Sequence, residues 1–140
     1  MPEATVRIEN DLSEIAKVHE KLDDFAEKFG VPLAVARTFH TIFDDLLDNV
    51  ISYGFNDEQR HFIDISLELT ADSLIVSIAD DGVPVNPLAK PTPDTKLSIE
   101  DRQIGGLGIH LVVNLADDIS YQRTVGKNVL TLTKSLQSNK

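Results

Sequence analysis

The stretch Ile78-Ala79-Asp80-Asp81-Gly82-Val83-Pro84 decides the fold of this chain. It ends a run in which every second residue is apolar, the pattern of a β-strand with one buried face. Asp80 has the parity of the apolar residues, so we expect its carboxylate to point to the covered side of the sheet, where it needs hydrogen-bond donors. A nucleobase amine would be such a donor, and Gly82 would let the backbone approach the ring. A turn-forming Asp-Asp-Gly explains the stretch equally well when it is taken alone.

The part of the chain before this stretch predicts two helices. Asn10 or Asp11 together with Glu14 resembles a capping box, which opens a first helix that runs toward Gly30. Pro32 suits the first turn of a second helix, whose apolar residues recur at helical spacing up to residue 53. The second helix is long and its period is strong.

The remaining segments predict strands and one long connection. Period-two patterns favour strands at 4–9, 62–69, 74–80, 119–123 and 128–136, and polar turns make hairpins of neighbouring pairs. The segment from Gly82 to Ile104 carries four prolines and little periodicity, which is typical of a functional lid. A helix is expected from Gly106 to Leu115.

Composition limits the kinds of protein this chain can be. Its 140 residues, 41% of them apolar, suit a single globular domain over residues 1–140. A net charge of −10 argues against a nucleic-acid surface, which needs clustered Lys and Arg. The absence of cysteine excludes disulfides, thiol catalysis and cysteine zinc sites. No leader-like segment opens the chain and no apolar run reaches membrane-spanning length, so we expect a soluble, cytoplasmic protein with no membrane partner.

Asp45 and Asn49 are four residues apart on the second predicted helix and therefore share one of its faces. Asn49 borders the apolar stripe and Asp45 lies just beyond it, whereas Asp44 and Asp48 fall opposite the stripe. A solvated acidic face explains Asp44 and Asp48, but an amide at the edge of the core needs partners. The pair is a candidate site in which the carboxylate of Asp45 and the carboxamide of Asn49 point to the same ligand.

The segment Gly105-Gly106-Leu107-Gly108 is expected to open a helix, and free amides in a helix's first turn can bind phosphate. A glycine-rich turn alone is a weak signal. The chain has no P-loop string, the dinucleotide-binding pattern lacks its preceding strand, and eukaryotic kinase signatures are missing. Its four histidines have no metal-ligand spacing, which favours surface or packing roles for them.

Taken in order, these blocks resemble the GHKL ATPases, the superfamily of gyrase B, histidine kinases and MutL. Residues 43–54 look like the N box, 78–84 like the first glycine box and 102–112 like the second. With Gly126-Lys127-Asn128-Val129-Leu130-Thr131-Leu132 near its end, the chain is most similar to the RsbW and SpoIIAB group. Those proteins are bacterial anti-sigma factors that are also serine kinases.

The resemblance implies a Bergerat fold, an α/β (α+β) two-layer sandwich whose mixed, mainly antiparallel sheet has helices on one face. It implies ATP and Mg²⁺ as cofactors. Asn49 would bind the Mg²⁺, Asp45 would be the general base, Asp80 would bind the adenine amino group and Gly82 would shape the base pocket. The remaining cofactor-binding positions are Arg102, Gly105, Gly106, Leu107, Gly108 and Asn128. Two positions depart from the family: Asp45 stands where Glu is common, and Asn128 where many relatives have Thr.

The function implied by the resemblance is that of a partner-switching kinase. It would phosphorylate a Ser or Thr of a STAS-domain anti-sigma factor antagonist and would otherwise sequester a sigma factor or another output protein. The likeness also implies a homodimer. Three other functions stay open on the sequence: a non-catalytic module whose ATP gates partner binding, a structural adaptor that binds no nucleotide, and a detached catalytic domain of a sensor kinase.

Overall fold

The computed structural model describes residues 2–53, 55, 59–82 and 115–136. Within them the chain forms a five-stranded sheet and two long helices, in the order β1, η1, α1, α2, β2, β3, β4, β5. All helices and strands that the sequence predicts inside these residues are present. The expected lid from Gly82 to Ile104 and the helix from Gly106 to Leu115 lie almost entirely outside the described residues.

The first helix begins with a short 3-10 turn, η1 (Leu12–Glu14), and continues as α1 (Ile15–Phe29). The predicted capping box is present in modified form: the Asp11 carboxylate accepts a hydrogen bond from the Ser13 amide, while Glu14 accepts one from the amide of Glu9. The helix ends at Gly30, whose left-handed φ of 78° lets its amide bond back to Ala26.

The second helix is α2 (Leu33–Tyr53), and it carries most of the helical contribution to the core. Phe39, Ile42, Phe43 and Leu47 are fully buried, as the helical spacing of apolar residues predicts. Its polar face keeps Asp44 and Asp48 exposed, whereas Asp45 and Asn49 are partly buried. The interpretation of Asp44 and Asp48 as a solvated face is therefore confirmed, and it does not extend to Asp45.

The sheet contains β1 (Glu3–Glu9), β2 (Phe62–Leu69), β3 (Ser73–Asp80), β4 (Asp118–Thr124) and β5 (Lys127–Ser135). The strand order is β1-β2-β3-β5-β4, and each neighbouring pair of described strands is antiparallel. The hairpin of β4 and β5 turns through Val125 and Gly126, which both have positive φ, 50° and 75°. This α+β architecture confirms the predicted fold class.

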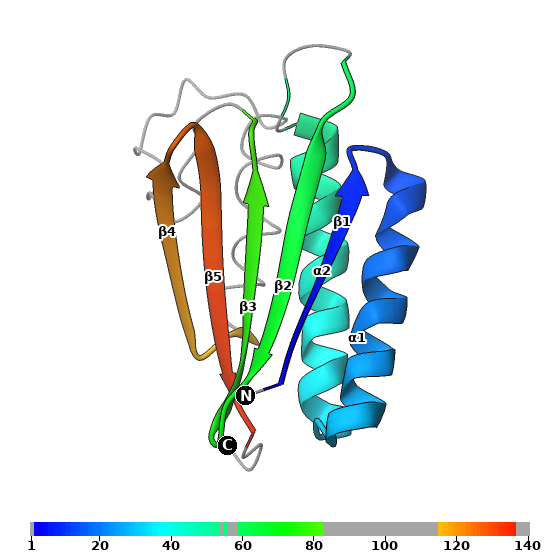
Figure 1. Ribbon diagram of the computed structural model, residues 1–140, viewed down its shortest axis with the longest axis vertical. Helices are drawn as coiled ribbons and strands as arrows, with labels where there is room; N and C mark the ends of the chain where they lie inside the picture. Colours follow the sequence, from blue (N-terminus) through cyan, green and yellow to red (C-terminus); the bar gives the residue numbers. More distant parts are fainter. Residues whose placement is uncertain (1, 54, 56–58, 83–114, 137–140) are drawn as a thin grey trace, which may run out of the picture.

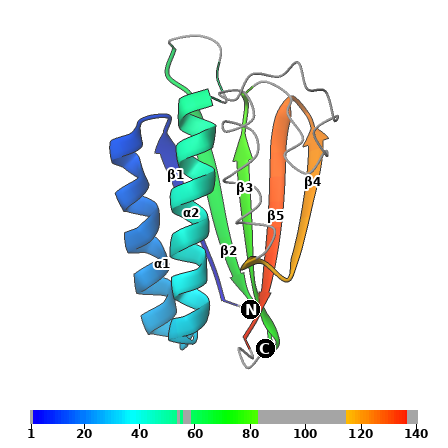
Figure 2. The same ribbon diagram turned by 180° about the vertical axis from the view of Figure 1, so that it is seen from behind.

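Both helices lie against one face of the sheet, with α2 over β2 and α1 toward β1 (Figures 1 and 2). The apolar residues of β2 and β3 that face them, from Ile63 to Ile78, form the core with the helices. The end of β3, the start of β5 and the end of β4 meet at one end of the molecule, the end toward which the C-terminal half of α2 also runs (Figure 1). Residues far apart in sequence are thereby brought together there.

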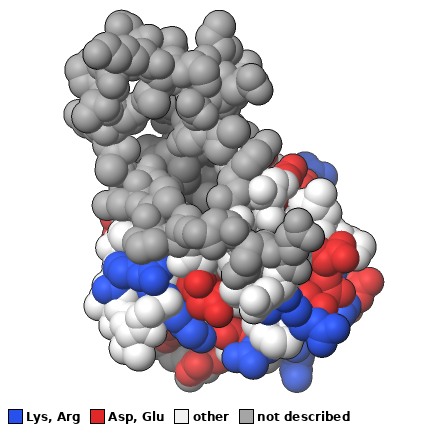
Figure 3. Space-filling view, turned by 90° about the horizontal axis from the view of Figure 1, so that it is seen from above, with Lys and Arg blue, Asp and Glu red and all other residues white. Residues whose placement is uncertain are grey.

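The view onto this end shows Lys and Arg interspersed with Asp and Glu on the described surface (Figure 3). Neither sign of charge forms a continuous field in that view. Within the described part of the chain, no helix is both long and apolar enough to cross a membrane.

Candidate functional site

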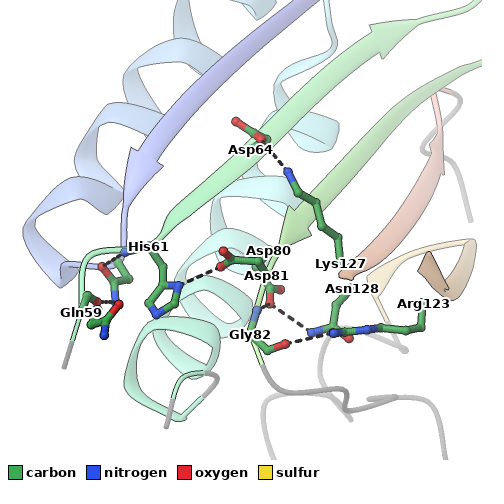
Figure 4. Close-up of polar contacts among 10 residues, drawn as sticks. Gln59, His61, Asp64, Asp80, Asp81, Gly82, Arg123, Lys127 and Asn128 are labelled. Atoms are coloured by element: carbon green, nitrogen blue, oxygen red, sulfur yellow. Dashed lines mark hydrogen bonds and ion pairs between the residues drawn. The ribbon is translucent and has the colours of Figure 1, made fainter. Parts of the chain in front are cut away.

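Asp80 is the buried carboxylate at the centre of the candidate site. It ends β3 on the helix-covered face and is only 7% exposed. Its Oδ1 accepts hydrogen bonds from the Gly82 amide at 2.9 Å and from the Asn128 Nδ2 at 3.1 Å (Figure 4). No hydrogen bond from the described residues reaches Oδ2 of Asp80, so this oxygen can accept one from a ligand. The predicted orientation of Asp80 is confirmed, while its ligand stays a prediction.

Asn128 and two side chains of β4 complete this cluster. In the sheet register Asn128 lies between Asp80 on β3 and Arg123 on β4. The Tyr121 hydroxyl donates to Oδ1 of Asn128 at 2.5 Å, and Nη1 of Arg123 donates to the carbonyl of Gly82 at 2.9 Å. The sequence reasoning missed Tyr121 and Arg123. Their alternation with Ile119 was the available signal, because it puts both on the face of β4 that carries the site.

Asp45 contributes a second carboxylate, from α2. Its Oδ2 is buried and has no hydrogen-bond partner, the one such side-chain atom among the described residues. Burial raises the pKa of Asp45 above its ordinary value of 3.8, and the nearby Asp44 and Asp48 raise it further. A buried oxygen without a donor is costly for a structural residue, whereas a proton acceptor benefits from a raised pKa.

Asn49 lies one helical turn after Asp45 and is partly buried, as its place beside the apolar stripe predicts. A carboxamide oxygen is a hard ligand of the kind that Mg²⁺ accepts. The chemistry of Asn49 and the unpaired oxygen of Asp45 therefore fit a Mg-nucleotide held near this turn of α2.

Asp81 points away from Asp80 and belongs to a separate polar contact (Figure 4). Its Oδ1 lies 3.0 Å from Nδ1 of His61, and the His61 ring stacks on Phe55 with centroids 4.4 Å apart. Two adjacent carboxylates thus have different environments, one buried against Asn128 and one paired at the surface.

The other predicted site residues, Arg102, Gly105, Gly106, Leu107 and Gly108, lie outside the described residues, and their roles stay predictions. Among the described residues no cluster of three or more His, Cys, Asp or Glu could hold a metal ion. His19 and His40 instead pack between the helices, with their Nδ1 atoms 2.5 Å apart.

A family comparison identifies the kind of domain that this geometry belongs to. Residues 8–134 match the model of the histidine kinase-like ATPase domain. The chain belongs to this family. Membership confirms the resemblance to the GHKL ATPases and implies ATP as the ligand of the domain.

Individual relatives of this histidine kinase-like ATPase domain agree with the assignment. The chain is 34% identical over 90 residues to the serine/threonine-protein kinase BtrW of Bordetella bronchiseptica (strain ATCC BAA-588 / NCTC 13252 / RB50). That match covers 64% of this chain and 63% of BtrW, less than two thirds of either. The crystal structure of the RsbU and RsbW domains of Rv1364c from Mycobacterium tuberculosis aligns with a TM-score of 0.67. It covers 96% of this chain and 32% of that one at 12% identity, and so shows the same fold.

Proposed function

We propose that this domain is a protein serine/threonine kinase of a partner-switching module. Its substrate would be a Ser or Thr hydroxyl on a STAS-domain anti-sigma factor antagonist, and it would release that partner to sequester a sigma factor or another output protein. The resemblance to the RsbW and SpoIIAB group supports this choice, and so does the similarity to a protein that is named a serine/threonine kinase.

The observation that carries the proposal is the unpaired, buried oxygen of Asp45. As an ionised base, Asp45 would accept the proton of the attacking Ser or Thr hydroxyl. The hydroxyl oxygen would form a bond to the γ-phosphorus of ATP while the bond from that phosphorus to the β-phosphate oxygen breaks, leaving ADP. A raised pKa brings the carboxylate closer to the basicity that proton transfer at neutral pH requires. The other demands of phosphoryl transfer are positioning and charge neutralisation.

The residues around Asp45 fit the two cofactors. Asp80 would accept a hydrogen bond from the adenine amino group through Oδ2, which accepts none from the described residues. Asn49 would be a ligand of Mg²⁺. A bound Mg²⁺ ion would neutralise negative charge on the phosphates. The chain, with a net charge of −10, has little positive charge for this purpose. Asn128 holds Asp80 in place by donating a hydrogen bond to Oδ1 of its carboxylate.

Calorimetric titration with ATP and ADP, with and without Mg²⁺, tests nucleotide binding without knowledge of the partner. We expect Asn49→Ala to abolish the Mg²⁺-dependent part of the affinity. We expect Asp45→Asn to keep binding and to lose phosphate transfer from radiolabelled ATP to a co-encoded STAS-domain protein. Equal affinity of Asn49→Ala and wild type in Mg²⁺ would refute the metal assignment. Nucleotide binding without phosphate transfer by the wild type would instead select the non-catalytic gating module.

A further inference from the structure

We propose that Tyr121 is a positioning residue that sets the base selectivity of the nucleotide site by fixing the orientation of the Asn128 carboxamide. The inference rests on the proposed ATP site and adds a residue to it. Tyr121 lies on β4, at the edge of the sheet, and reaches Asn128 diagonally across the strand pair.

The Asn128 side chain can present either its amide nitrogen or its oxygen to Asp80, and the two orientations have opposite consequences. With the nitrogen toward Asp80, the amide donates to the carboxylate at 3.1 Å. With the oxygen toward Asp80, two acceptors face each other in a buried setting, because Asn128 is 9% and Asp80 7% exposed. The Asp80 carboxylate can only accept, so it selects the orientation with the nitrogen toward it and leaves the amide oxygen for a second partner.

Tyr121 supplies the second contact that holds this orientation, because its hydroxyl donates to Oδ1 of Asn128 at 2.5 Å. The Gly82 amide donates to the same oxygen of Asp80, Oδ1, at 2.9 Å. A flipped amide would lose the bond to Asp80, and the Tyr121 hydroxyl would have to turn from donor to acceptor. The Tyr121 hydroxyl therefore restrains the Asn128 amide, and the amide in turn restrains Oδ1 of Asp80.

The locked carboxylate presents Oδ2 as a fixed acceptor. A purine with an amino group at position 6 can donate to this oxygen, whereas a purine with hydrogen or a carbonyl oxygen there cannot. A hydrogen bond to a charged group gives discrimination of roughly 10- to 100-fold. Loss of the Tyr121 hydroxyl should weaken ATP binding and leave the affinity for a purine without the 6-amino group nearly unchanged, since other residues would hold the ribose and phosphates.

The test compares the affinity for ATP with the affinity for purine riboside triphosphate, which has hydrogen in place of the 6-amino group, both with Mg²⁺. In the wild type we expect the ratio to favour ATP by at least about 10-fold. Tyr121→Phe keeps the aromatic ring, and we expect the ratio to fall by roughly 5-fold or more through weaker ATP binding. Ser120→Ala removes a hydroxyl from the residue of β4 that precedes Tyr121 and is exposed. It serves as the matched control, with an unchanged ratio.

A double-mutant cycle with Asn128→Ala separates positioning from a structural effect. Without the amide, Tyr121→Phe should change the ratio no further. A uniform loss of affinity for both nucleotides in Tyr121→Phe, or the same ratio as wild type, would overturn the role of Tyr121 while leaving the ATP site intact. A wild type that binds ATP and the analogue equally would overturn the adenine contact of Asp80, and with it this inference.

Discussion

The substitution Asp45→Asn should stabilise the protein at neutral pH, although it removes the proposed base. In the folded chain the pKa of Asp45 is raised, chiefly by burial and further by Asp44 and Asp48. Below pH 3.8 the carboxyl is protonated in both the folded and the unfolded chain, so its ionisation has no effect on stability. As the pH rises above this value, the unfolded chain ionises first and the folded state loses stability. The loss is complete once the pH exceeds the raised pKa of the folded state.

The magnitude follows from the one buried oxygen without a donor. An unsatisfied buried polar group costs about 1–3 kcal/mol. The neutral amide of asparagine retains part of this cost, so we expect Asp45→Asn to gain about 1 kcal/mol at pH 7, a rise in Tm of about 3 °C for a domain of this size. Urea or thermal unfolding between pH 4 and 8, without nucleotide or Mg²⁺, measures the gain.

Removing any carboxylate from an acidic chain relieves general repulsion, so a matched control is needed. Asp24→Asn removes one charge from an exposed position of α1. The gain of Asp45→Asn should exceed that of the control at pH 7 and shrink toward it near pH 4. A variant less stable than wild type at pH 7, or a gain independent of pH, would refute the claim that Asp45 is held ionised at a cost.

Three further substitutions test local contacts, two of them through stability and one through ATP binding. Val125→Asn should raise the free energy of unfolding by about 1 kcal/mol, because a β-branched residue is strained at φ 50° in the β4–β5 turn; unchanged urea unfolding would count against this strain. His40→Ala should lower the free energy of unfolding by about 1 kcal/mol, since it removes the partner of Nδ1 of His19, and equal stability in urea would contradict it. Arg123→Gln should weaken ATP binding several-fold by freeing the Gly82 carbonyl, which calorimetry measures against Gln122→Ala on the opposite face of β4.

Much of the fold follows from local sequence pattern, because each helix and strand has one buried face. The alternation of apolar residues in β3 was enough to place Asp80 on the covered side of the sheet. The spacing on α2 was enough to separate exposed Asp44 from partly buried Asp45. Tyr121 and Arg123 were not predicted, because their roles depend on β4 pairing with β5 and on β5 pairing with β3. That strand order is a tertiary property which period-two patterns do not contain.

Three residues whose local environment is energetically unfavourable also indicate where the candidate site lies, independently of the comparison with relatives. Asp45 has a buried oxygen without a donor, Asp80 is a buried carboxylate, and Val125 holds a conformation unfavourable to its side chain. Asp80 ends β3, and Val125 lies in the turn between β4 and β5. The end of β3 and this turn lie at one end of the sheet, the end toward which α2 runs (Figure 1). Folding alone would favour removing each cost, and the rest of the described core contains apolar side chains that follow the local rules. Local costs of this kind gather at functional sites, so the ATP proposal and these three residues point to the same end of the sheet.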